Sequence, residues 1–155
     1  MHRILFLLFC ATVALHAAGT LAMYPESTEP VATQANPDFT AGKAAIVAKD
    51  WPRAIAALNA AAKYDNNNAD IHNLLGYAQR NNGNFELALK HYGRALTLDP
   101  RHLGAREYLG ELYLKQNNLA KAEEQRAMLV KLCPKPCEEL TELSEKIDAY
   151  RKKTR

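Results

Sequence analysis

The chain has 155 residues, 48% of them apolar, and a formal net charge of +3. That length fits one ordinary domain rather than two. The basic residues form no stripe beyond the C-terminal tail RKKTR, so the charge gives no case for a nucleic-acid partner.

Residues 1–22 have the layout of a secretory signal peptide. Arg3 precedes an uninterrupted apolar run of 12 residues, Ile4 to Leu15, and small residues follow it. A membrane-spanning helix needs about 20 apolar residues, so this run is short for a span. We therefore expect cleavage after Ala22 and export, with the bacterial periplasm as the expected compartment. The chain would stay at a membrane only if this segment were left uncleaved.

The texture of the sequence changes after the predicted signal peptide. Residues 23–36 mix Pro, Ser, Thr and Glu without apolar periodicity, which predicts a flexible lead-in. From Pro37 onward Ala, Leu, Lys, Glu and Gln dominate, with few β-branched residues and no alternation of polar and apolar positions. This pattern predicts an all-α domain.

A period of 34 residues runs through this helical region. Three glycines, three alanines and three bulky apolar residues each keep that spacing: Gly42, Gly76 and Gly110; Ala54, Ala88 and Ala122; Trp51, Phe85 and Leu119. A glycine inside a helix costs about 1 kcal/mol relative to alanine, so its recurrence needs a packing reason. We expect each glycine to let the second helix of a pair approach closely, with the alanine as the small residue opposite. Such a period is the mark of helix–turn–helix repeats.

The middle copy resembles a tetratricopeptide repeat (TPR). Residues 74–100 read LLGYAQRNNGNFELALKHYGRALTLDP, and the residues that carry the resemblance are Leu75, Gly76, Ala88, Tyr92, Ala95 and Pro100. The third copy carries Leu109, Gly110, Tyr113, Ala122 and Pro134. The first copy has Asn66 in place of the proline, and all three lack the opening tryptophan of the family pattern.

The resemblance implies three TPR units in residues 37–134, at about 35–68, 69–102 and 103–136, stacked as a short right-handed solenoid. The open end of such a stack needs a cap with a polar outer face. Residues 137–155 supply one as a helix and a basic tail, because Leu140, Leu143, Ile147 and Tyr150 fall on one helical stripe.

The resemblance also implies a mode of action. In this family the first helix of each pair lines a concave groove that holds a peptide or helix of a partner protein. Tyr77 is the preferred anchor here, since aromatic side chains dominate interface energetics. The exposed groove-side candidates are Lys43, Asn73, Tyr77, Arg80, Glu107, Glu111 and Lys115.

The sequence gives no sign of an active site. It has no phosphate-binding glycine loop, no His-Glu-x-x-His and no nucleophile elbow, and no two histidines share a helical turn. We therefore expect no enzyme, no cofactor and no metal. The expected function is a non-enzymatic adaptor or scaffold that binds an unidentified protein or peptide.

Cys133 and Cys137 bracket the junction between the last repeat and the cap. Cleavage of the signal peptide would remove Cys10 and leave this pair alone in an oxidising compartment, which favours a disulfide. Such a bond would fix the angle at which the cap folds back. An alternative stays open, in which the pair makes the chain a thiol-redox or metal carrier.

Overall fold

A computed structural model describes residues 36–154, which lie within one compact unit. The predicted signal peptide and residues 23–35 of the predicted lead-in lie outside the described residues. The described part contains seven α-helices and no strand: α1 (Pro37–Val47), α2 (Trp51–Tyr64), α3 (Ala69–Asn81), α4 (Phe85–Leu98), α5 (Leu103–Lys115), α6 (Leu119–Leu132) and α7 (Glu138–Lys153). The all-α prediction is confirmed.

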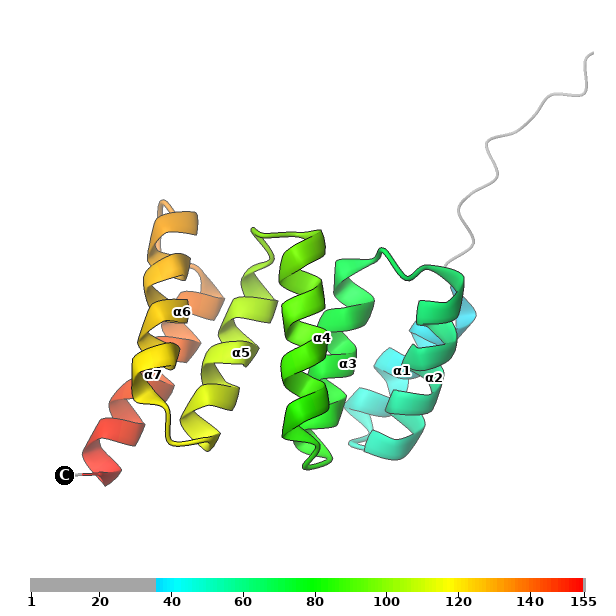
Figure 1. Cartoon of the computed structure of the whole chain (residues 1–155), viewed down its shortest axis with the longest axis horizontal. Coiled ribbons are helices and arrows are strands. Elements are labelled where there is room, and N and C mark those ends of the chain that lie inside the picture. The colour runs from blue at the N-terminus through cyan, green and yellow to red at the C-terminus, as the bar shows by residue number, and fades with distance from the viewer. Residues whose placement is uncertain (1–35, 155) are drawn as a thin grey trace, which may run out of the picture. The chain divides into compact units, whose positions relative to one another are not determined.

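The helices stand side by side in chain order (Figure 1). Helices α1 and α2, α3 and α4, and α5 and α6 form three helix–turn–helix pairs, and α7 follows as the predicted cap. Asparagine starts three of the helices, since the side chains of Asn36, Asn68 and Asn118 accept backbone N–H bonds in the first turns of α1, α3 and α6. No helix in residues 36–154 is long and apolar enough to cross a membrane.

The repeated glycines do bring helices close together, but their partners differ from the prediction. A Cβ on Gly42 would lie 2.6 Å from Leu58 Cγ, and one on Gly76 would lie 2.6 Å from Tyr92 Cδ1. Each glycine thus receives a large side chain from the second helix of its pair, whereas we expected an alanine opposite. Ala54 and Ala88 are fully buried and make room elsewhere in the core.

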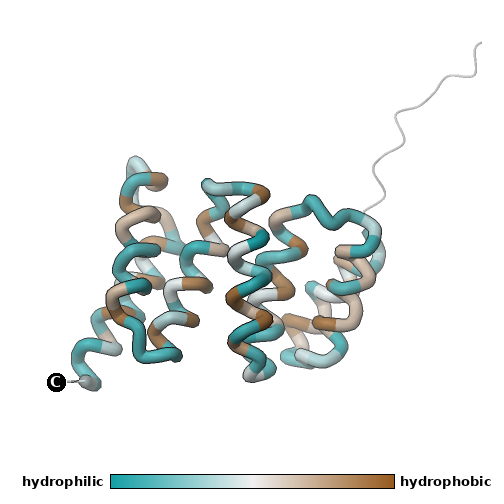
Figure 2. The backbone as a smooth tube through the Cα atoms, viewed as in Figure 1, coloured by the Kyte–Doolittle hydropathy of each residue, from teal (hydrophilic) through white to brown (hydrophobic). Residues whose placement is uncertain are grey.

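The third pair departs from this pattern. A Cβ on Gly110 would lie 2.7 Å from Leu143 Cδ1, which belongs to α7 and not to α6. Leu143 and Ile147 of α7 are buried with Leu129 of α6 in one apolar cluster. Hydrophobic positions recur along each helix among hydrophilic ones in Figure 2, as expected for helices that bury one stripe. Helix α7 therefore completes the core of the third pair.

Candidate functional site

The centre of the candidate site is an arginine held between two tyrosines. The ring centroids of Tyr77 on α3 and Tyr108 on α5 are 4.9 Å apart. The Arg80 guanidinium carbon lies 5.2 Å from the Tyr77 centroid and 5.3 Å from the Tyr108 centroid. Arg80 Nη1 also donates to Glu111 Oε2 at 2.5 Å. Stacking and the ion pair together fix this platform of Tyr77, Arg80 and Tyr108 in place.

The platform lies in a hollow of about 350 Å³, which we call the central hollow. Helices α3, α5 and α7 line it with Tyr77, Arg80, Asn81, Tyr108, Glu111, Lys115, Glu142 and Lys146. The structure thus brings together four of the seven predicted groove residues: Tyr77, Arg80, Glu111 and Lys115. The sequence analysis missed Tyr108, although its spacing of three residues from Glu111 places both on one face of α5.

Helix α7 lines the central hollow as well, which the sequence analysis did not expect. Glu142 and Lys146 come from α7, and Lys146 Nζ lies 3.6 Å from Glu111 Oε1. No sequence signal could have found them, because the side of α7 that faces α5 is set by how Leu143 packs against Gly110. The cap is therefore part of the candidate site.

The predicted exposure was wrong for three of the candidates. Asn73, Arg80 and Glu107 are buried, with exposed fractions of 7%, 5% and 5%. Arg80 is covered because it pairs with Glu111 under the tyrosine rings, while Asn73 and Glu107 line a recess beside α7. Lys43 is exposed on α1 over the Phe39 ring and does not line the central hollow.

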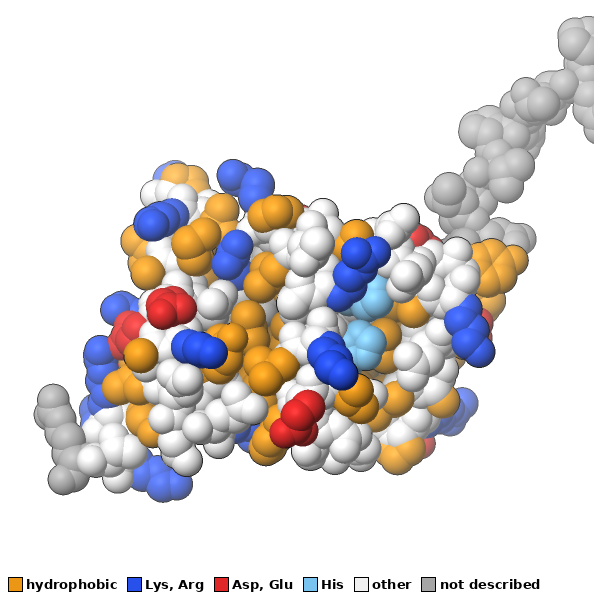
Figure 3. Space-filling model, in the orientation of Figure 1, with side chains coloured by type: hydrophobic (Ala, Val, Ile, Leu, Met, Phe, Trp, Pro, Cys, Tyr) orange, Lys and Arg blue, Asp and Glu red, His pale blue; other side chains and the backbone are white. Residues whose placement is uncertain are grey.

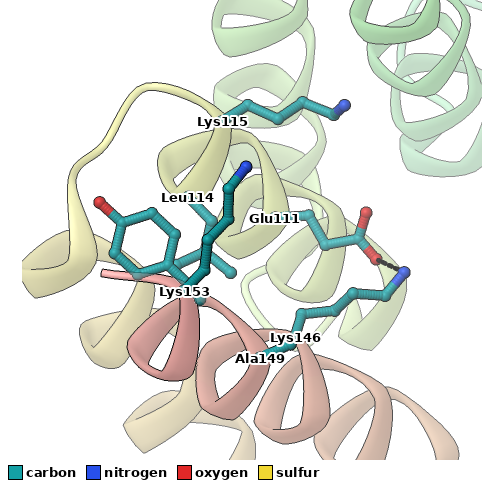
Figure 4. Close-up of a pocket in the computed structure, with 7 residues that line it drawn as sticks. Glu111, Leu114, Lys115, Lys146, Ala149 and Lys153 are labelled. Atoms are coloured by element: carbon teal, nitrogen blue, oxygen red, sulfur yellow. Dashed lines mark ion pairs between the residues drawn. The ribbon is translucent and has the colours of Figure 1, made fainter. Parts of the chain in front are cut away.

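Two further hollows adjoin the central one and differ in charge. The acidic hollow, of about 230 Å³, is lined by Asn73, Leu74, Gly104, Glu107, Tyr108, Glu138, Glu139 and Glu142. The lysine hollow, of about 350 Å³, is lined by Glu111, Leu114, Lys115, Lys146, Ala149, Tyr150 and Lys153. Figure 4 shows its three lysines around the space between α5 and α7, with Lys146 directed toward Glu111. Each of the two shares lining residues with the central hollow.

The acidic hollow changes the protonation of its carboxyl groups. Burial raises the pKa of Glu107 to about 8, and the charge and hydrogen bond of Glu142 act in the same direction, as do the charges of Glu111 and Glu139. Carboxylate oxygens of Glu107, Glu111 and Glu142 lie within 4.8 Å of one another. Such a cluster holds a proton near neutral pH or accepts a cation.

Two histidines also meet, on a different face. Nδ1 of His72 on α3 lies 3.3 Å from Nδ1 of His91 on α4, and His72 Nε2 lies 3.1 Å from the carbonyl oxygen of Asn66. Burial and the neighbouring His72 lower the pKa of His91. In Figure 3 histidine side chains are visible at the surface of this face. The sequence analysis considered only histidines on one helix and missed a pair made across two. No cysteine or carboxylate among the described residues joins them as a third ligand.

Cys133 and Cys137 occupy the ends of the two helices that they were expected to connect. Cys133 caps the C-terminus of α6, and Cys137 precedes α7. Their Cα atoms are 6.0 Å apart, and the structure pairs their sulfur atoms. This separation is ordinary for a disulfide. Oxidation of the pair in the protein stays a prediction.

Comparison with known proteins agrees with this fold. The tetratricopeptide repeat family matches residues 69–102, the α3–α4 unit. The human protein O-mannosyl-transferase TMTC3 is 35% identical over 85 residues, which cover 55% of this chain and 9% of that protein. The mouse TMTC3 is 33% identical over the same length and the same shares. This chain thus spans a small part of those relatives.

Solved structures resemble most of the described part. The Arabidopsis OM64 TPR domain has a TM-score of 0.66 at 18% identity and covers 74% of this chain and 93% of that one. The Yersinia enterocolitica type III secretion chaperone SycD, in complex with a peptide of the translocator YopD, has a TM-score of 0.67 at 20% identity, covering 77% and 93%. The second TPR domain of human RPAP3, in complex with an HSP70 peptide, has a TM-score of 0.62 at 22% identity, covering 70% and 91%. The fold is a TPR solenoid of three units with a capping helix.

Proposed function

We propose that this chain is a non-enzymatic adaptor that binds an extended or helical segment of a partner protein in the central hollow. The observation that carries the proposal is the platform of Tyr77, Arg80 and Tyr108, a fixed aromatic surface beside charged groups of both signs. Aromatic and arginine side chains are enriched where interfaces gain most of their energy. The SycD and RPAP3 structures, each described with a bound peptide, support this reading.

The place of action is part of the same proposal. The apolar run in residues 1–22 supports export, and the periplasm is the compartment that we propose. The transferase activity named for the TMTC3 relatives does not enter the proposal, because the match covers 9% of their length.

Replacing Tyr77 with alanine should weaken partner binding about tenfold or more, because it removes half of the aromatic platform. The measurement uses 12-residue peptides selected by display on the purified protein, with affinity followed by fluorescence anisotropy. Tyr64→Ala is the matched control, since Tyr64 is 90% exposed on α2 and lies outside the central hollow. Arg80 is unsuitable for this test, because its loss would leave Glu111 partly unpaired.

Thermal unfolding of both variants shows whether either change disturbs the fold. If Tyr77→Ala binds the selected peptides as tightly as the parent, or if Tyr64→Ala loses as much affinity, the central hollow is not the binding site.

We propose in addition that Cys133 and Cys137 form a structural disulfide. Replacing both with serine should lower the free energy of unfolding by about 1 to 3 kcal/mol, because the loop between α6 and α7 is no longer closed. Since Glu142 and Lys146 of α7 line the central hollow, peptide affinity should fall as well. Urea denaturation and hydrogen exchange would place the loss in α7, with α1 and α2 little affected.

Alkylation and mass spectrometry of the protein purified from its native host supply the decisive check. Two free thiols in that protein would contradict the disulfide. Unchanged stability of the double serine variant, together with loss of a bound metal or of thiol exchange, would favour a carrier function instead.

A further inference from the structure

The acidic hollow contains buried acceptors that nothing in the described protein satisfies. Oε1 of Glu107 has no hydrogen-bond partner, and Glu107 is 95% buried. Oδ1 of Asn73 also has none, and Asn73 is 93% buried on the neighbouring helix α3. Both side chains line the same hollow. A buried acceptor without a partner costs about 1 to 3 kcal/mol, so two of them in one recess need an explanation.

The hollow also lacks a compensating cation. Among the described residues, no Lys, Arg or His nitrogen lies within 4.0 Å of a carboxylate oxygen of Glu107 or Glu142. The nearby cations are engaged elsewhere: Arg80 and Lys146 pair with Glu111, and Arg106 donates to the carbonyl oxygen of Pro100. Glu138 and Glu139 bring further negative charge from the first turn of α7.

A purely structural explanation accounts for only part of this arrangement. Acidic residues in the first turn stabilise a helix, which explains Glu138 and Glu139. A shared proton, indicated by the raised pKa of Glu107, relieves the repulsion between Glu107 and Glu142. Neither explanation provides a donor for Asn73 Oδ1.

The geometry favours an organic cation over a metal ion. A divalent ion held by Glu107, Glu111 and Glu142 would have to take Glu111 from both Arg80 and Lys146. An ammonium or guanidinium group needs only acceptors, and Glu107, Glu142 and Asn73 offer them without breaking an ion pair. Lysine carries three N–H donors and arginine five.

We propose that Asn73, Glu107 and Glu142 form a pocket that receives a lysine or arginine side chain of the partner segment. This inference rests on the proposed function, since the acidic hollow shares Tyr108 and Glu142 with the central hollow. The basic residue would enter beside the start of α7 while the rest of the segment crosses the platform. The pocket thereby sets both a sequence requirement on the partner and the direction in which it binds.

The first test needs no partner. Butylammonium chloride and methylguanidinium chloride are titrated separately into the protein as its host processes it, at pH 8.5, with the glutamate carboxyl carbons followed by NMR. Saturable shifts are expected at Glu107 and Glu142. The apparent affinity should fall at least about fivefold in Glu107→Gln and in Glu142→Gln, because each loses a charged acceptor. Glu145→Gln, which removes the same charge from an exposed position of α7, should change nothing.

Two results of this titration would overturn the pocket. Tetramethylammonium chloride has no N–H donor, so equal shifts with this salt would mean general screening of charge. Tight binding of calcium or zinc chloride at Glu107 and Glu142, with no effect of the organic cations, would mean a metal site.

The second test uses the display-selected peptides. Replacing one lysine or arginine of such a peptide with glutamine should cost about tenfold in affinity for the parent protein and nothing for Glu107→Gln. If peptides bind through Tyr77 but no basic residue shows this coupling, the pocket is wrong and the proposed function stands. If no peptide binds at all while butylammonium still binds at Glu107, the proposed function fails and the pocket stands.

Discussion

Replacing Gly76 with alanine should lower the free energy of unfolding by about 1 to 3 kcal/mol, because the new methyl group collides with a buried ring. A Cβ at this position would lie 2.6 Å from both Cδ1 and Cε1 of Tyr92. Tyr92 is fully buried, so its ring cannot swing toward solvent to make room. The loss should exceed the gain in helix propensity of about 1 kcal/mol that alanine brings. Urea denaturation of the purified protein measures the net effect.

Gly93 provides a matched control one residue after Tyr92. It also lies inside a helix, but nothing comes within 4 Å of the place where its Cβ would be. Gly93→Ala should therefore raise stability, by up to about 1 kcal/mol. The two substitutions are chemically identical and should have opposite signs. A stabilising Gly76→Ala would mean that close approach of α3 and α4 does not require glycine.

The sequence was sufficient to predict the fold because the repeat recurs in residue type. Glycine at 42, 76 and 110 and alanine at 54, 88 and 122 mark the same register three times, so the helix pairs follow directly. The partners of the glycines do not recur in this way. The residues 16 positions after each glycine are Leu58, Tyr92 and Arg126, three different types. A search by residue class cannot find contacts of that kind.

The backbone hides a second period for the same reason. Lys49, Gly83 and Asn117 are 34 residues apart, and each has a positive φ, of 56°, 86° and 56°. They occupy the turn between the two helices of each pair. Only glycine and asparagine favour this conformation, so the sequence indicated a turn at two of the three positions. At Lys49 the packing of α1 against α2 imposes the conformation.

The candidate site was predictable only in part. Spacing around Gly76 and Gly110 placed Tyr77, Arg80, Glu111 and Lys115 on facing sides of α3 and α5, and the central hollow contains all four. Burial could not be predicted, because it depends on the ion pair of Arg80 with Glu111 and on the position of α7. Both arise from contacts between residues more than 30 positions apart. Long-range contacts of this kind leave no periodic signal in the chain.

The role of α7 leads to a prediction about the third pair of helices. Arg126 stands where Leu58 and Tyr92 fill the space beside their glycines, and Arg126 is partly exposed and donates to Glu123 Oε2 at 2.8 Å. Leu143 of α7 takes the place beside Gly110 instead. The third pair should therefore depend on α7 for its core.

A double-mutant cycle between Gly110 and Leu143 measures that dependence. Leu143→Ala should cost about 2 to 4 kcal/mol, since the side chain is fully buried. Gly110→Ala should cost about 1 to 3 kcal/mol, because its Cβ would lie 2.7 Å from Leu143. Together they should cost at least about 1 kcal/mol less than the sum, because the shortened side chain at 143 vacates the space that the new methyl group needs. Urea denaturation of the four proteins gives the coupling.

Leu129 serves as the control for this cycle. It is fully buried in the same apolar cluster, but it lies on α6 and is not among the atoms nearest to a Cβ on Gly110. Gly110→Ala and Leu129→Ala should therefore add to within about 0.5 kcal/mol. Equal coupling in both cycles would mean that the cluster relaxes as a whole. Strict additivity of Gly110 and Leu143 would mean that α7 does not occupy the space beside Gly110, and the central hollow would then lose its third wall.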